Sequence, residues 1–165
     1  MNFTVCAFTG HRNISKKHEN KLADILARGI AYAYSKGCRK FLTGGAIGFD
    51  TVAAEEIIKF KRSHSDVLFI LVIPCKNQSA KWSDSQKAVY KRILADADGV
   101  ICISDEYTPT CMRERNKYLA ENADILLSYV CRPNSGSAQT VRMASALSCE
   151  IYNLYTALEK EENVP

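Results

Sequence analysis

The chain lacks the closely spaced cysteine pairs that mark zinc sites and disulfide frameworks. Its seven cysteines are odd in number and widely separated, and no two of them form a C-x-x-C pair. A structural zinc ion or a disulfide-stapled fold is therefore not expected. Cys6, Cys38 and Cys102 lie in or beside apolar runs, where a thiol behaves as a small hydrophobic group. Reduced thiols of this kind predict a cytoplasmic protein, and no signal peptide or membrane-spanning run opposes that prediction.

Common catalytic motifs are missing as well. The sequence has no G-x-S-x-G elbow, no H-E-x-x-H pair and no Gly-Lys-Ser/Thr to complete a P-loop. It has only three histidines, and two of them, His18 and His64, lie in or beside charged stretches. These absences argue against a serine hydrolase, a zinc protease and a P-loop NTPase. We expect neither a metal site nor a resident cofactor.

A strong excess of charge of one sign is also absent. The net charge is +4, from 22 basic and 18 acidic residues, which is weak for a protein that binds nucleic acid. Aromatic residues do not interleave with arginines as they do on single-stranded nucleic acid surfaces, so a nucleic acid partner is not expected. The 165 residues, 47% of them hydrophobic, suffice for one domain. We place it at residues 1–158, followed by a charged tail at 159–165.

What the chain does contain is a regular alternation of short apolar runs with helical patterns. Strands are expected near residues 3–8, 40–43, 67–73, 99–103, 124–129 and 151–155. Helices are expected after Ser15, near 50–62, after a capping box of Ser83 and Gln86, near 112–122 and near 138–148. The strands are apolar throughout, and Pro74 is expected to stop the third. The pattern predicts a doubly wound, Rossmann-like parallel sheet of about six strands with helices on both faces.

A glycine-rich segment stands between the second strand and the second helix. Gly44, Gly45 and Gly48 precede Asp50 there, so backbone amides at the start of the helix could face a bound phosphate. The same residues also fit a tight turn in which glycines supply positive φ and Asp50 caps the helix. Both interpretations stay open at this point.

Other loops at the same edge of the predicted sheet carry residue types that bind anions. Ligands of doubly wound folds bind beyond the carboxyl ends of the strands. Arg12 and Arg115 could bind phosphate bidentately or be solvated, and His11 could carry a proton or simply form a turn. Ser137 could present its hydroxyl in a second phosphate nest or simply cap its helix, and Trp82 could stack on a base or cover the core edge. The expected ligand-binding residues are Thr9, Gly10, His11, Arg12, Gly44, Gly45, Gly48, Asp50, Trp82, Arg115, Asn116, Gly136, Ser137 and Thr140.

Five blocks of residues together carry a family resemblance. They are residues 8–12 (FTGHR), 42–50 (LTGGAIGFD), Ile73-Pro74 with Trp82, Arg115-Asn116, and Gly136-Ser137 with Thr140. Over residues 3–155 the chain resembles the YpsA-like branch of the SLOG superfamily. The resemblance implies a Rossmann-like domain related to the DNA-processing protein DprA and to the LOG phosphoribohydrolases. It also implies a pocket for nucleotides or their derivatives, used by enzymes that cleave N-glycosidic bonds or by sensors in bacterial stress or phage defence.

The chain departs from the LOG enzymes in one block. Those enzymes carry P-G-G-x-G-T-x-x-E, whose glutamate serves catalysis, whereas residues 134–142 here read NSGSAQTVR. Without that glutamate the obvious general base for glycosidic cleavage is missing. Asp50 and Glu114 are the candidate replacements, because they are the carboxylates best placed near the rim.

The sequence thus predicts a cytoplasmic protein that binds a nucleotide-derived small molecule, as a sensor or regulatory module. The alternative is a hydrolase or transferase acting at a nucleotide N-glycosidic bond. A homo-oligomer is compatible with four tyrosines, which could equally finish the edge of the core. They are Tyr32, Tyr34, Tyr152 and Tyr155.

Overall fold

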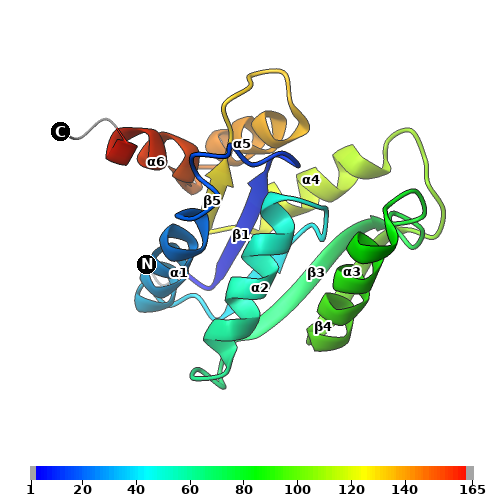
Figure 1. Ribbon diagram of the computed structural model, residues 1–165, viewed down its shortest axis with the longest axis horizontal. Helices are drawn as coiled ribbons and strands as arrows, with labels where there is room; N and C mark the ends of the chain where they lie inside the picture. Colours follow the sequence, from blue (N-terminus) through cyan, green and yellow to red (C-terminus); the bar gives the residue numbers. More distant parts are fainter. Residues whose placement is uncertain (1–2, 163–165) are drawn as a thin grey trace.

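Strands and helices alternate as the apolar runs predict in the computed structural model, which describes residues 3–162. Within that range the strands are β1 (Val5–Gly10), β2 (Lys40–Thr43), β3 (Leu68–Cys75), β4 (Gly99–Ser104), β5 (Ile125–Tyr129) and β6 (Glu150–Asn153). The helices are α1 (Leu22–Ser35), α2 (Phe49–Lys61), α3 (Asp84–Asp96), α4 (Cys111–Asn122), α5 (Gly136–Ala146) and α6 (Leu154–Glu162). Figure 1 shows their arrangement.

The strands form one parallel sheet in the order β4-β3-β2-β1-β5-β6. The chain therefore moves outward from β1 to β4 on one side and then returns to place β5 and β6 on the other side. Cys6 in β1 pairs with Phe41 of β2 and with Ile125 of β5. This order confirms the predicted doubly wound fold. The direction of strand order reverses between the neighbouring strands β1 and β5.

Both faces of the sheet are covered because alternate strand residues point to opposite sides. Phe8 and Phe41 belong to the larger core, which also contains the buried residues of α1, α2, α3 and α6. Ala7 and Leu42 belong to the smaller core, with buried residues of α4 and α5. The apolar character of the strands on both faces follows directly from this arrangement.

The first helix begins later than its pattern predicts. Residues 16–21 form turns, and α1 starts at Leu22 rather than after Ser15. The His18 side chain is fully buried, with Nδ1 2.7 Å from the hydroxyl of Tyr129. That contact, 111 residues away in sequence, draws the segment inward and replaces the expected first turns of helix.

The end of the third strand also differs from expectation. Pro74 does not stop β3, which continues to Cys75. Proline has no backbone N–H and cannot donate to a neighbouring strand. It is tolerated at position 74 because β2 pairs with β3 only as far as Leu71, so no residue of β2 lies opposite Pro74.

The last strand is shorter than expected, and a helix follows it at once. β6 ends at Asn153, whose Oδ1 accepts the backbone N–H of Val130 (3.1 Å) and of Tyr155 (3.2 Å). Helix α6 begins at Leu154 and runs through residue 159, where the sequence predicts a charged tail. Leu154 and Leu158 are buried in the larger core, which explains the helix. Residues 163–165 lie outside the described residues.

Candidate functional site

The loop after β2 is held against the loop after β1 by close backbone packing. Gly48, the residue before α2, has φ +83°, and a Cβ on it would lie 2.1 Å from the carbonyl oxygen of Arg12. The N–H of Phe49 donates to the carbonyl of His11 (3.1 Å). Glycine is therefore required at position 48 so that the two loops can form one rim at the carboxyl edge of the sheet.

Arg115 reaches this rim from the first turns of α4. Its side chain is only 5% exposed. Nη1 donates to the carbonyl oxygen of Gly44 (2.7 Å) and Nε donates to Oδ1 of Asn116 (2.9 Å). A Cβ on Gly44 would lie 2.4 Å from Nη1, so the missing side chain at Gly44 is what admits the guanidinium. Burial lowers the pKa of Arg115, and the neighbouring Asp50 carboxyl opposes this shift.

Asp50 lies beside Arg115 in the first turn of α2 and is 6% exposed. Its Oδ2 accepts the N–H of Ala46 (3.2 Å), so the side chain braces the glycine-rich loop and makes no N-cap bond. Its Oδ1 is buried and has no hydrogen-bond partner within residues 3–162. Burial raises the pKa of Asp50 to about 6, against the opposing effects of Arg115, the Ala46 N–H and Arg12. The site thus holds a buried acceptor that no group in the described part of the chain satisfies.

Arg12 contributes a second guanidinium to the same place. It is exposed and makes no hydrogen bond or ion pair within the part of the chain that the structure describes. The charge of Arg12 nevertheless acts on Asp50 and Arg115, because it helps to lower the pKa of each of these two groups. Two arginines and one carboxyl group therefore meet at the glycine-rich loop.

His11 organises the neighbouring loop. It is 4% exposed, and its Nε2 accepts the N–H of Cys131 (2.9 Å). Burial, and to a lesser extent the charge of Arg132, lowers the pKa of His11. A neutral ring that accepts at Nε2 carries its proton on Nδ1. In this structure His11 positions the loop between β5 and α5.

The start of α5 completes the rim, although not through the predicted cap. Ser135 caps this helix by accepting the N–H of Ala138 (3.1 Å), whereas Ser137 lies inside its first turn. The expectation that Ser137 caps α5 is therefore wrong. Thr140 is fully buried and donates to the carbonyl of Gly136 (3.0 Å). A Cβ on Gly136 would lie 3.5 Å from Nδ2 of Asn116, so the first turns of α4 and α5 adjoin.

Several predicted residues stand away from this cluster or are engaged elsewhere. Trp82 is half-buried and packs edge-on against Tyr90, with 5.1 Å between ring centroids. Glu114 is exposed and accepts the hydroxyl of Thr110 (3.3 Å). Thr9 is buried in β1 opposite Ser128. A Cβ on Gly10 would lie 2.4 Å from the ring of Phe49, so Gly10 admits α2 close to β1.

One residue that the motifs did not single out, Gln78, supports the glycine-rich loop. The Nε2 of Gln78 donates to the hydroxyl of Tyr90 (2.9 Å) and to the carbonyl of Gly45 (3.4 Å). Thr43, at the end of β2, is fully buried, and its hydroxyl has no partner within residues 3–162. In the sequence, only the position of Gln78 shortly after an apolar strand indicates that it could lie near the site.

The four tyrosines proposed for an oligomer interface all contact their own chain. The hydroxyls of Tyr32 and Tyr152 lie 2.9 Å apart, and Tyr34 donates to Asp66. Tyr155 packs edge-on against His18. Tyr32, Tyr34 and Tyr155 also pack against the larger core, whereas Tyr152 is exposed, and a homo-oligomer stays a prediction.

The parallel sheet, its reversal at β1 and the glycine-rich rim define a Rossmann-like domain of the doubly wound class. The sequence model of the YspA SLOG family matches residues 6–156, so the chain belongs to that family. This confirms the family resemblance that the motif blocks indicate.

Curated relatives share this family relationship at modest identity. The SPbeta prophage-derived protein YoqJ of Bacillus subtilis strain 168 is 29% identical over 117 residues, which cover 64% of this chain and 68% of YoqJ. The UPF0398 protein BH1768 of Halalkalibacterium halodurans is 28% identical over 132 residues, which cover 77% of this chain and 66% of that protein. The chain thus spans about two thirds of the length of these relatives.

Solved structures share the fold. DprA of Streptococcus pneumoniae matches with a TM-score of 0.67 and 18% identity, over 92% of this chain and half (50%) of that one. DprA of Helicobacter pylori, whose structure concerns its single-stranded DNA binding mode, matches with a TM-score of 0.65 and 19% identity, over 91% of this chain and 64% of that one. At these identities the likeness concerns the fold alone.

Two other kinds of site have no counterpart within residues 3–162. No helix there is both long and apolar enough to cross a membrane. No group of three or more histidine, cysteine, aspartate or glutamate side chains gathers there as a metal ion would require.

Proposed function

We propose that the chain binds a nucleotide or nucleotide derivative at the rim formed by the loops after β1 and β2 and the first turns of α4 and α5. The observation that carries this proposal is the meeting of buried Arg115, exposed Arg12 and the unpartnered Oδ1 of Asp50 beside the glycine-rich loop. Two cations and a free acceptor are what a phosphate and a sugar hydroxyl need.

The phosphate would lie between the two guanidinium groups. Nη1 and Nε of Arg115 are bonded to protein, which leaves Nη2 to face the ligand. Within residues 3–162 the amides of Gly45, Ile47 and Gly48 donate to no protein group. These amides and Arg12 would complete the anion site, and the amide of Gly136 adjoins it beside Asn116.

Asp50 would bind the sugar. A ribose hydroxyl that donates to Oδ1 would satisfy the orphaned acceptor and favour the ionised carboxylate. Ligand binding would then lower the pKa of Asp50 from about 6. This arrangement suits a sensor or regulatory binding module.

The second candidate is an enzyme that cleaves a nucleotide N-glycosidic bond, and the raised pKa of Asp50 favours it. A carboxyl with a pKa of about 6 exchanges protons readily near neutral pH, as a general acid or base must. The position at which the LOG block carries glutamate is Arg142, whose Nη1 donates to the carbonyl of Pro133 (2.8 Å). Asp50 would therefore have to act as the base.

The test is a thermal-shift screen against nucleoside mono-, di- and triphosphates, NAD and ADP-ribose, with mass spectrometry of each mixture after incubation. A ligand at a hundred times its Kd should stabilise the fold by about 2.7 kcal/mol. Intact ligand after stabilisation supports a binding module, whereas a released base that disappears in Asp50→Asn supports the enzyme. No stabilisation by any of these compounds contradicts both.

A single-stranded oligonucleotide belongs in the same screen. The chain shares its fold with the Helicobacter pylori protein, which weighs mildly against the expectation that nucleic acid is no partner. We expect no shift with the oligonucleotide. Binding that weakens steeply with salt would assign a nucleic acid partner instead.

A further inference from the structure

Three cavities flank the rim, and they differ in size and in the polar side chains that line them. One, of about 250 Å³, includes Thr51 and Gln86, which bond to Ala46 and Ser83. Another, of about 220 Å³, includes Tyr129, whose hydroxyl accepts the N–H of Ser15. The largest of the three, of about 380 Å³, we call the Glu19 pocket. It is lined by Arg12, Asn13, Ile14, Glu19, Leu22 and Val52.

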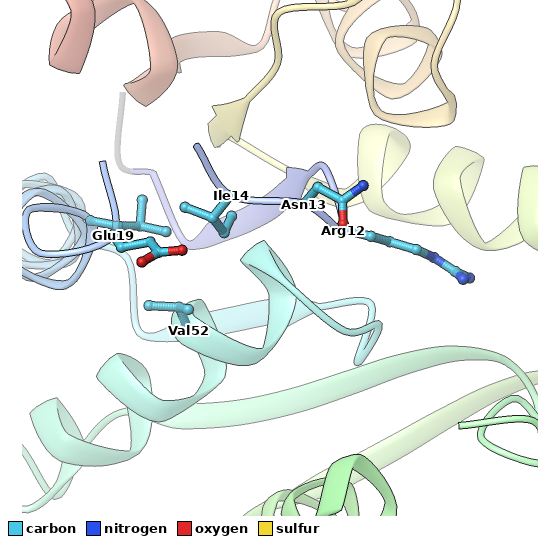
Figure 2. A pocket seen from close by; sticks show the side chains of 6 residues that line it. Arg12, Asn13, Ile14, Glu19 and Val52 are labelled. Carbon is cyan, nitrogen blue, oxygen red and sulfur yellow. The ribbon is translucent and has the colours of Figure 1, made fainter. Parts of the chain in front are cut away.

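The Glu19 pocket combines an apolar floor with unpaired polar groups. Figure 2 shows the carboxylate of Glu19 extending between Ile14 and Val52. Within residues 3–162 neither this carboxylate nor the side-chain amide of Asn13 makes a hydrogen bond or ion pair. A flat ring could therefore lie on the aliphatic side chains while its edge meets an acceptor-only group.

Arg12 joins this pocket to the anion site. The main chain of Arg12 passes directly over Gly48, and Arg12 is one of the residues that line the pocket. Its side chain points away from Glu19 (Figure 2), and its charge acts on Asp50 and Arg115. A nucleotide whose phosphate is held by the two arginines would thus have beside it the Glu19 pocket, which Arg12 itself lines.

We propose that the Glu19 pocket binds the base of the ligand and selects guanine; this rests on the function proposed above. Guanine presents two adjacent N–H donors, at N1 and N2, which one carboxylate can accept together. Adenine and cytosine each place a ring nitrogen acceptor beside a single amino donor, so the carboxylate would face a lone pair. Hypoxanthine keeps N1–H and lacks the second donor.

The experiment measures the binding of GMP, IMP and AMP to the full chain by calorimetry. A hydrogen bond to a charged group contributes enough to change affinity by about tenfold or more. We expect GMP to bind at least about tenfold more tightly than IMP or AMP. The Glu19→Gln variant offers one acceptor oxygen and one amide donor, so it should bind GMP more weakly, bind AMP at least as tightly as the wild type does, and lose the preference for GMP.

The matched control is Asp24→Asn. Asp24→Asn removes the same charge from an exposed position on α1 outside the pocket, and it should keep the preference for GMP. Equal binding of the three nucleotides, a preference that survives Glu19→Gln, or binding of other nucleotides only would overturn the guanine pocket and leave the proposed function intact. Failure of every nucleotide to bind would overturn both.

Discussion

Two clusters of buried polar side chains lie near the carboxyl edge of this sheet, and one is closed while the other is open. In the closed cluster, His18 has Nδ1 2.7 Å from the Tyr129 hydroxyl and Nε2 2.8 Å from Oε1 of Glu159 in an ion-pair contact. Lys17 Nζ approaches the same oxygen at 2.9 Å, and the N–H of Ser15 donates to Tyr129. The Tyr129 hydroxyl is hydrogen-bonded on both sides, and His18 Nε2 and Glu159 Oε1, which make no hydrogen bond within residues 3–162, lie in ion-pair contact with each other.

The open cluster contains similar ingredients with a different outcome. Asp50 and Arg115 are buried as well, yet Oδ1 of Asp50 has no partner within residues 3–162 and Arg12 is left unpaired beside it. An unsatisfied buried acceptor is costly to the fold, and such groups are concentrated where a ligand completes them. The difference gives the closed cluster a structural role and supports the proposal that the open cluster binds a ligand.

The largest expected effect comes from removing the glycine that supports the open cluster. Gly48→Ala combines a φ of +83° with a Cβ only 2.1 Å from a backbone oxygen. We expect a loss of unfolding free energy of at least about 3 kcal/mol, measured by urea denaturation. Gly136→Ala, where the nearest atom would be 3.5 Å away, is the control and should change stability by less than about 1 kcal/mol. Equal effects would contradict the close packing of the two loops.

The second effect is a pH dependence that originates in Asp50. Its folded pKa of about 6 lies above the ordinary 3.8, so ionisation destabilises the folded state. The stabilising contribution is complete below about pH 4 and is lost as the pH rises through 6. Relative to Asp50→Asn, the wild-type chain should lose about 2–3 kcal/mol across this interval, since one pKa unit corresponds to about 1.4 kcal/mol. A constant difference between the two proteins from pH 4 to 7 would contradict it.

A smaller effect tests the closed cluster. Tyr129→Phe removes the hydroxyl that meets both Ser15 and His18, so unfolding free energy should fall by about 1–2 kcal/mol. Tyr118→Phe removes a hydroxyl that has no partner within residues 3–162 and should have almost no effect. Ligand-induced stabilisation should be retained in both variants. If Tyr129→Phe abolished it, the closed cluster would be part of the binding site.

The smallest effect on stability belongs to Arg12. Because Arg12 is exposed and has no side-chain partner among residues 3–162, Arg12→Ala should change unfolding free energy by less than about 0.5 kcal/mol. The same variant should lose the melting shift produced by whichever nucleotide stabilises the wild type. Arg62→Ala, at the opposite end of α2, serves as the control and should keep the shift. Retention of the shift in Arg12→Ala would remove Arg12 from the anion site.

Local patterns in the sequence were sufficient for most of the fold. The capping box at the start of α3 is confirmed, because Ser83 Oγ accepts the N–H of Gln86 (3.2 Å) and the Ser83 N–H donates to Gln86 Oε1 (3.0 Å). Runs of a few apolar residues likewise predict the strands. The alternation of these strands with helices predicts a doubly wound sheet.

What local patterns missed depends on partners far away in the chain. His18 lies in a charged stretch that predicts a helix, yet contacts with Tyr129 and Glu159 bury it. The pairing of Arg115 with Gly44 crosses 71 residues, and its burial has no counterpart in the sequence around either residue. Ser135 and Ser137 are equivalent as caps in the sequence, and only the helix boundary at Gly136 distinguishes them.

The central place of β1 has a consequence for synthesis on the ribosome. Its two edges are completed at different times, because the partners of Cys6 follow it by 35 residues (Phe41) and by 119 residues (Ile125). At typical elongation rates of 5–20 residues per second, that second edge stays without its neighbour for about 6–24 seconds. During that interval an apolar strand edge is open to pairing with other nascent chains.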